Sequence, residues 1–212
     1  MRYGVLGTGV VGTTLADGLL ALGHEVRMGS RTADNAEATA WAAGKVRASH
    51  GTFADAAQFG EALVLATSWD GTKAALALCG PEHTRAKLLI DVTNPLDFSH
   101  GAPPRLADCG GRSGGELVAQ WSEARVVKAF NIVGAPFMVS PKFPGGPPTM
   151  FIAGDDADAK RWVVALAEAF GWEVADSGPL ASAAYLEAMA MVWIIYGFTG
   201  GSWAHAFKML KA

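Results

Sequence analysis

The tightest constraint on the fold comes from a glycine motif near the start of the chain. Its G-x-G-x-x-G pattern is made by Gly7, Thr8, Gly9, Val10, Val11 and Gly12. The motif directly follows an apolar run over residues 3–6, expected to be a strand, and opens a helical pattern over residues 10–22. The string alone carries little weight because 26 of the 212 residues are glycine. In this strand-to-helix position, however, it is typical of the first turn of a Rossmann domain.

Each glycine of the motif has a physical role in binding a dinucleotide. Gly7 permits the tight turn, Gly9 removes a side chain that would block a pyrophosphate, and Gly12 lets the helix pack closely on the strand. The helix N-terminus then presents unpaired N–H groups to the anion. The motif therefore predicts a dinucleotide site, in preference to a glycine-rich turn without a ligand.

The rest of the chain alternates between short apolar runs and longer helical patterns, as βαβ units do. We expect an α/β fold of the Rossmann type, with a doubly wound, mostly parallel sheet and a small, mainly helical C-terminal segment. Further strands are predicted at 25–28, 62–66, 88–92, 126–130, 150–153 and 172–175. Further helices are predicted from Thr32 to about residue 43, and at 71–78, 114–121, 157–170, 183–196 and 203–210. We place a dinucleotide-binding domain at 1–154 and a smaller segment at 155–212.

The residues after the second predicted strand discriminate between NAD and NADP. NAD enzymes normally place an acid there for the ribose 2′-hydroxyl, but this chain has Ser30, Arg31 and Thr32, and no carboxylate before Asp34. A guanidinium beside hydroxyl groups suits a 2′-phosphate. Thr32 is interpreted equally well as the N-cap of the next helix. The pattern favours NADP(H).

Further dinucleotide contacts are expected where later parallel strands end. Trp69 would form a wall beside the ribose or the nicotinamide, or would simply pack on its loop. The side chains of Asn94 and Asn131 would bind a carboxamide, or would cap their loops. The predicted contacts at these strand ends are Thr67, Ser68, Trp69, Asn94, Pro95 and Asn131.

Composition excludes several classes of protein. Half of the residues are hydrophobic, 17% are charged, and the net charge is −3, so neither disorder nor a nucleic-acid or membrane-surface partner is expected. Cys79 and Cys109 fit no metal or redox spacing, and the five histidines are dispersed, so no metal site is predicted. These features suit a reducing, cytoplasmic location, and no signal peptide is expected.

Two other patterns were weighed as catalytic groups. Residues 111–115 match the G-x-S-x-G of a hydrolase elbow, but they follow a loop instead of a strand; Ser113 and Glu116 better match a helix capping box. Lys128 lies on a strand approaching the site, and the sequence leaves its role open. The chain has no evident proton donor, which suits direct hydride transfer between two rings.

In the order and spacing of its motifs, the chain resembles the coenzyme F420-dependent NADP oxidoreductases, and also the reductase domain of STEAP metalloreductases. The resemblance covers nearly the whole chain. Besides the glycine motif, it rests on residues 23–26, 29–31, 126–131, 154–156 and 176–180.

The resemblance implies hydride exchange between NADPH and a deazaflavin or flavin ring, without an acid–base catalytic residue. By position it assigns NADP contacts to Thr8, Val10, Val11, Ser30 and Arg31, and nicotinamide-end contacts to Thr67, Asn94, Ala129 and Asn131. Asn131 matches the metalloreductase-like version, where deazaflavin enzymes carry histidine. Asn35 stands where some members carry a further basic residue. The second substrate therefore remains open between coenzyme F420 and a flavin.

Two alternatives come from other classes: a non-catalytic NADP-sensing module, and a hydroxyacid or imine reductase. The second would need a larger C-terminal domain than this chain has. The apolar run 188–198 is about half the ~20 residues that span a bilayer and is expected to be a buried helix in the core or at a subunit interface. We predict a homodimer through this region.

Overall fold

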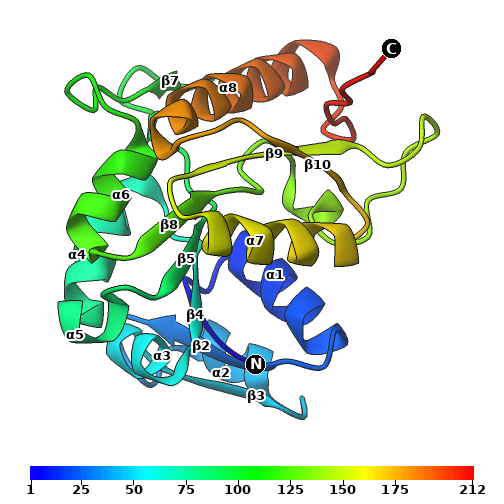
Figure 1. Cartoon of the computed structure of the whole chain (residues 1–212). Helices are drawn as coiled ribbons and strands as arrows, with labels where there is room; N and C mark the ends of the chain where they lie inside the picture. The colour runs from blue at the N-terminus through cyan, green and yellow to red at the C-terminus, as the bar shows by residue number, and fades with distance from the viewer.

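A computed structural model describes the whole chain, residues 1–212, as an eight-stranded sheet with helices on both faces (Figure 1). The strand order is β10-β9-β8-β5-β4-β1-β2-β3, and every pairing is parallel except β8 with β9. The strands are β1 (Arg2–Leu6), β2 (Glu25–Ser30), β3 (Ala48–Thr52), β4 (Ala62–Leu65), β5 (Leu88–Asp91), β8 (Arg125–Lys128), β9 (Thr149–Gly154) and β10 (Glu173–Asp176). The predicted doubly wound, mostly parallel architecture is confirmed.

The helices divide between the two faces because strand side chains alternate across the sheet. On β4, Ala62 and Val64 belong to a core cluster of 29 residues, whereas Leu63 and Leu65 belong to a second cluster of 16 residues. The first lies under α1 (Val10–Ala21), α2 (Ala36–Ala42) and α7 (Ala157–Ala169). The second lies under α3 (Phe53–Phe59), α4 (Trp69–Cys79) and α6 (Gly114–Ser122). A short helix, α5 (Pro81–Thr84), joins α4 to β5.

One βα unit was missed by sequence reasoning. β3 is the outer strand beside β2, and its sequence, Ala-Ser-His-Gly-Thr, lacks the apolar run that marks the inner strands. α3 follows at once, with Thr52 and Asp55 forming a capping box at its start. An edge strand half exposed to solvent carries little hydrophobic periodicity, and this explains the omission.

The segment after residue 154 continues the same sheet. β9 runs antiparallel to β8, and β10 pairs in parallel with β9, with α7 between them. A two-stranded hairpin, β6 (Leu96–Asp97) and β7 (Arg105–Leu106), was also missed. The division at residue 154 stays a prediction.

The last helix, α8 (Ala183–Gly200), differs from the expected buried helix. Its buried positions recur at helical spacing, but its other face exposes large apolar side chains: Tyr185, Val192, Ile195, Tyr196 and Phe198. By length and composition alone, the stretch Leu180–Gly200 is long enough and apolar enough to cross a membrane, with a mean hydropathy of 1.4. Core helices of soluble proteins share this property, and 33% of the apolar part of this stretch is buried inside the protein.

The predicted helix at 203–210 is wrong. After α8 the chain is irregular, and its backbone bonds to Thr149 at the start of β9: Thr149 N donates to the Phe207 carbonyl. Trp203 packs on Trp193 of α8, with ring centroids 5.2 Å apart. The tail therefore satisfies its polar groups on the existing fold instead of forming its own helix.

Candidate functional site

The main crevice opens where the strand order reverses, between β1 and β4. In open α/β sheets this switch point, outside the carboxyl ends of the strands, is where dinucleotides bind. A cavity of about 710 Å³ lies here, lined by the loops after β1, β2 and β4. The predicted residues that line it are Gly7, Thr8, Gly9, Ser30, Arg31, Thr32, Thr67 and Ser68.

The three motif glycines have the geometry their predicted roles require. Gly7 has a φ of +126°, and a Cβ there would lie 2.4 Å from the Ala66 carbonyl oxygen. A Cβ on Gly12 would lie 2.3 Å from the Gly7 carbonyl oxygen, so this glycine permits the close helix–strand approach. A Cβ on Gly9 would meet nothing within 4 Å. The turn thus leaves open space at the N-terminus of α1, which has no side-chain cap.

The end of β2 provides the cavity's only cationic lining residue. Arg31 is exposed and takes part in none of the protein's ion pairs. Ser30 lies beside it, and its hydroxyl donates to the Thr32 carbonyl. The N-cap of α2 is Asn35, whose side chain accepts from Ala38 N, so the interpretation of Thr32 as the cap is wrong. A free guanidinium at this edge suits a phosphate group.

A second, smaller cavity of about 260 Å³ shares Thr67 and Ser68 with the first. It continues past Val11 and Trp69 to the loop after β5, where Asn94 lines it. Trp69 also packs against Trp121, with ring centroids 5.6 Å apart, so it serves both as wall and as packing residue. The two cavities together follow the carboxyl ends of β1, β4 and β5.

The other predicted residues lie at or behind these walls. Val10 is 69% exposed at the start of α1. Gly12 and Pro95 are buried, and Ala129 has no exposed surface, so its side chain packs beneath the site. Asn131 lies directly behind Asn94.

Asn131 and Asn94 are held as a pair. Asn94 Nδ2 donates to the Asn131 carbonyl at 2.8 Å, and Asn131 Nδ2 donates to Asn94 Oδ1 at 2.9 Å and to the Leu186 carbonyl at 3.1 Å. Asn131 Oδ1 is buried and has no hydrogen-bond partner. Phe130, just before it, has a φ of +59°, a strained conformation for a bulky residue that turns the chain at the end of β8. Such an orphaned acceptor fits a ligand amide.

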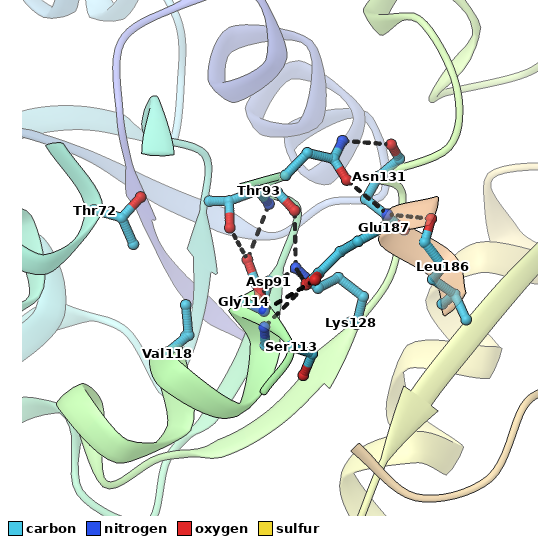
Figure 2. A network of polar contacts seen from close by, with 12 residues as sticks. Thr72, Asp91, Thr93, Ser113, Gly114, Val118, Lys128, Asn131, Leu186 and Glu187 are labelled. Carbon is cyan, nitrogen blue, oxygen red and sulfur yellow. Dashed lines mark hydrogen bonds and ion pairs between the residues drawn. The ribbon is translucent and has the colours of Figure 1, made fainter. Parts of the chain in front are cut away.

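The role of Lys128, open from sequence, is resolved in Figure 2. Its ammonium is fully buried and lies 2.6 Å from Asp91 Oδ2 and 2.9 Å from Glu187 Oε1. It also donates to the Thr93 carbonyl at 2.8 Å. Burial by itself would lower the pKa of Lys128, but the carboxylates of Asp91 and Glu187 raise it above its ordinary value. The side chain therefore stays charged, and because it is fully buried and lines neither cavity, it acts as a structural centre.

Both carboxylates also accept hydrogen bonds from backbone N–H groups. Asp91 accepts from the Thr93 N–H and hydroxyl, and Glu187 accepts from the N–H groups of Gly114 and Gly115 at the start of α6 (Figure 2). The cluster ties β5, β8, α6 and α8 together next to Asn94 and Asn131. Sequence reasoning missed Asp91 and Glu187, although an acid that closes an apolar strand and another within an apolar helix were available signals.

Ser113 caps α6. Its side chain accepts from Glu116 N, and the Glu116 carboxylate accepts from Ser113 N at 2.8 Å, forming the predicted capping box. Because the hydroxyl is buried and so engaged, the preference for a cap over a hydrolase nucleophile is confirmed.

Comparison with known proteins agrees with this geometry. Residues 2–95 match the family described as NADP oxidoreductase, coenzyme F420-dependent. The F420-dependent NADP reductase of Methanothermobacter marburgensis is 32% identical over 199 residues, covering 88% of each chain. The chain belongs to this family. It is an NADP-dependent oxidoreductase, as predicted.

Two further relatives extend the comparison. The crystal structure of a candidate F420-dependent NADP reductase from Arthrobacter sp. FB24 has a TM-score of 0.91 and 37% identity, and 99% of each chain is covered. Rat metalloreductase STEAP3 is 29% identical over 90% of this chain, which spans 36% of the STEAP3 length. These two relatives represent the two groups of proteins that the sequence was predicted to resemble.

Proposed function

We propose that the protein transfers a hydride between NADPH and the deazaflavin coenzyme F420. The proposal is supported by the match to the coenzyme F420-dependent NADP oxidoreductase family and by the similarity to the F420-dependent NADP reductase of Methanothermobacter marburgensis. In this reaction a hydride leaves the dihydronicotinamide ring for the acceptor ring, and water supplies the accompanying proton.

The observation that carries the proposal is the smaller cavity at the nicotinamide end of the crevice. Its walls consist mainly of apolar side chains, among them Val11, Val92, Leu96 and Phe98, and of side chains that carry hydroxyl groups. Among its lining residues Asp70 is the only acidic or basic one, so no His, Lys or Tyr lines this cavity to donate a proton. Such a site suits ring-to-ring transfer, in which holding two rings at near-attack distance provides the rate enhancement.

The geometry of the crevice supports the following contacts with NADP. Gly9 and the N-terminus of α1 would hold the pyrophosphate, and Ser30 with Arg31 would hold the 2′-phosphate. Thr67, Asn94 and Asn131 would orient the nicotinamide, with Asn131 Oδ1 accepting from the carboxamide. Ala129 and Gly12 contribute by packing.

The experiment mixes the protein with NADPH and, separately, F420, FMN, FAD or no acceptor, and follows NADPH absorbance. Fast oxidation with F420 alone supports the proposal. Oxidation with a flavin alone would replace F420 by the second candidate acceptor, which the similarity to STEAP3 favours. NADPH binding without turnover on any acceptor would contradict both and favour a sensing role.

We propose that a second copy of the chain covers the exposed face of α8. Tyr185, Val192, Ile195, Tyr196 and Phe198 form one apolar face, and contiguous exposed apolar surface marks an interface.

Cys79 and Cys109 are both free thiols, which supports the proposed cytoplasmic location.

A further inference from the structure

A carboxylate that the sequence did not indicate, that of Glu37, lies within hydrogen-bond distance of the crevice wall, although Glu37 itself does not line the cavity. Thr8, which lines the main cavity, donates its hydroxyl hydrogen to Glu37 Oε2 at 2.8 Å. Glu37 lies in the first turn of α2 and is exposed, and it reaches the glycine motif from a position 29 residues away. It therefore places a negative charge beside Thr8, which lines the same cavity as the positively charged Arg31.

The donors available to a phosphate are correspondingly few. The Thr8 hydroxyl donates to Glu37, and the Ser30 hydroxyl donates to the Thr32 carbonyl at 2.5 Å. The Asn35 side-chain oxygen is used to cap α2, which leaves its amide nitrogen. A 2′-phosphate would meet Arg31 and the Asn35 amide, but it would also meet the Glu37 carboxylate on the Thr8 side.

An unmodified ribose would meet a different balance. NAD-binding sites of this fold use a carboxylate near the end of the second strand to accept from the 2′-hydroxyl. This chain has no acid at the carboxyl end of β2, but the contact of Glu37 with Thr8 brings one from α2 to the wall of the same cavity. The same side chain would thus repel a phosphate and accept a hydroxyl hydrogen.

We infer that Glu37 is a specificity-determining residue that reduces the preference for NADP over NAD and gives the site a second, NAD-accepting mode. The inference rests on the proposed NADP site. Arg31 and Glu37 act in opposite directions on the same 2′ position. The net preference between NADP and NAD would then be the difference between the two effects.

The test measures binding of two probes that lack the nicotinamide, adenosine 2′,5′-bisphosphate and adenosine 5′-monophosphate, by titration calorimetry at low salt. Glu37→Gln keeps the size of the side chain and removes its charge. We expect it to tighten bisphosphate binding about fivefold, the scale of one unit charge a few ångströms away in water. Binding of the monophosphate should be unchanged or weaker.

Asp34→Asn is the matched control, because Asp34 is an exposed acid just before α2 whose side chain makes no hydrogen bond to a cavity-lining residue, unlike Glu37. It should change either affinity less than twofold. Equal tightening by Glu37→Gln and Asp34→Asn, or no change with Glu37→Gln, would overturn the role of Glu37 while leaving the NADP site intact. If the unaltered protein binds neither the bisphosphate nor NADPH, the proposed site itself is overturned.

Discussion

The ammonium of Lys128, at the end of β8, lies 2.9 Å from the carboxylate of Glu187 in α8, and both side chains are buried. This contact joins the C-terminal helix to the sheet next to Asn94 and Asn131, at the proposed nicotinamide end of the crevice. Asp91 completes the cluster from β5. Through these contacts the cluster holds the loops at the ends of β5 and β8 in place.

Lys128→Met should destabilise the protein by about 3–5 kcal/mol, because it leaves two buried carboxylates without their cation. The free energy of unfolding in urea measures the loss. Arg85→Met is the control: its ion pair with Glu123 is exposed and screened by solvent, so its loss should destabilise the protein much less. Equal losses for the two variants would show that the buried cluster has no special weight.

Gly9→Ala should weaken the binding of NADPH while changing the stability of the fold only slightly. Its Cβ meets no protein atom, so stability should fall by at most about 1 kcal/mol, the scale of an N-cap change. NADPH binding should weaken at least about tenfold, because the Cβ enters the space expected for the pyrophosphate. Gly12→Ala is the counterpart: its Cβ would clash with the Gly7 carbonyl and should destabilise the fold. Normal NADPH affinity in Gly9→Ala would contradict the proposed pyrophosphate position.

Arg31→Ala should raise the KM for NADPH by about 10–100-fold, the scale of a lost hydrogen bond to a charged group, and should change the KM for NADH much less. Steady-state kinetics with both cofactors measure the difference. Arg161→Ala removes an exposed arginine from α7 and serves as control. An equal loss with NADPH and NADH would refute a contact between Arg31 and the 2′-phosphate.

Asn131→Ala should lower kcat/KM for NADPH about tenfold or more by removing the acceptor for the carboxamide and the support of Asn94. Binding of adenosine 2′,5′-bisphosphate should stay unchanged, because this probe has no nicotinamide. Weaker binding of the probe would indicate a general disturbance of the site, and the proposed role of Asn131 would fail.

Val192→Lys should convert the proposed dimer into a monomer, because it places a charge on the exposed apolar face of α8, where Val192 is 59% exposed. Light scattering at micromolar concentration measures the mass. Val46→Lys, at a residue 79% exposed outside α8, should leave the mass unchanged. A monomeric unaltered protein would contradict the dimer.

The sequence by itself determined the features that depend on neighbouring residues. The glycine motif between a strand and a helix predicted the turn and the crevice, because only glycine tolerates the φ of Gly7 and the close approach at Gly12. The alternation of apolar periods predicted the inner strands and most helices, and the spacing of Ser113 and Glu116 predicted a cap. These signals are local and survive without knowledge of the fold.

Only the tertiary structure decided which distant groups meet. The sequence contains Lys128, Asp91 and Glu187 in separate elements, and their ion pairs exist because the sheet order places β5 beside β8 with α8 over their ends. The contact of Thr8 with Glu37 arises in the same way. The edge strand β3 has no clear apolar period, and the tail after α8 has a helical pattern but forms no helix. In both segments, contacts with the rest of the chain fix the conformation.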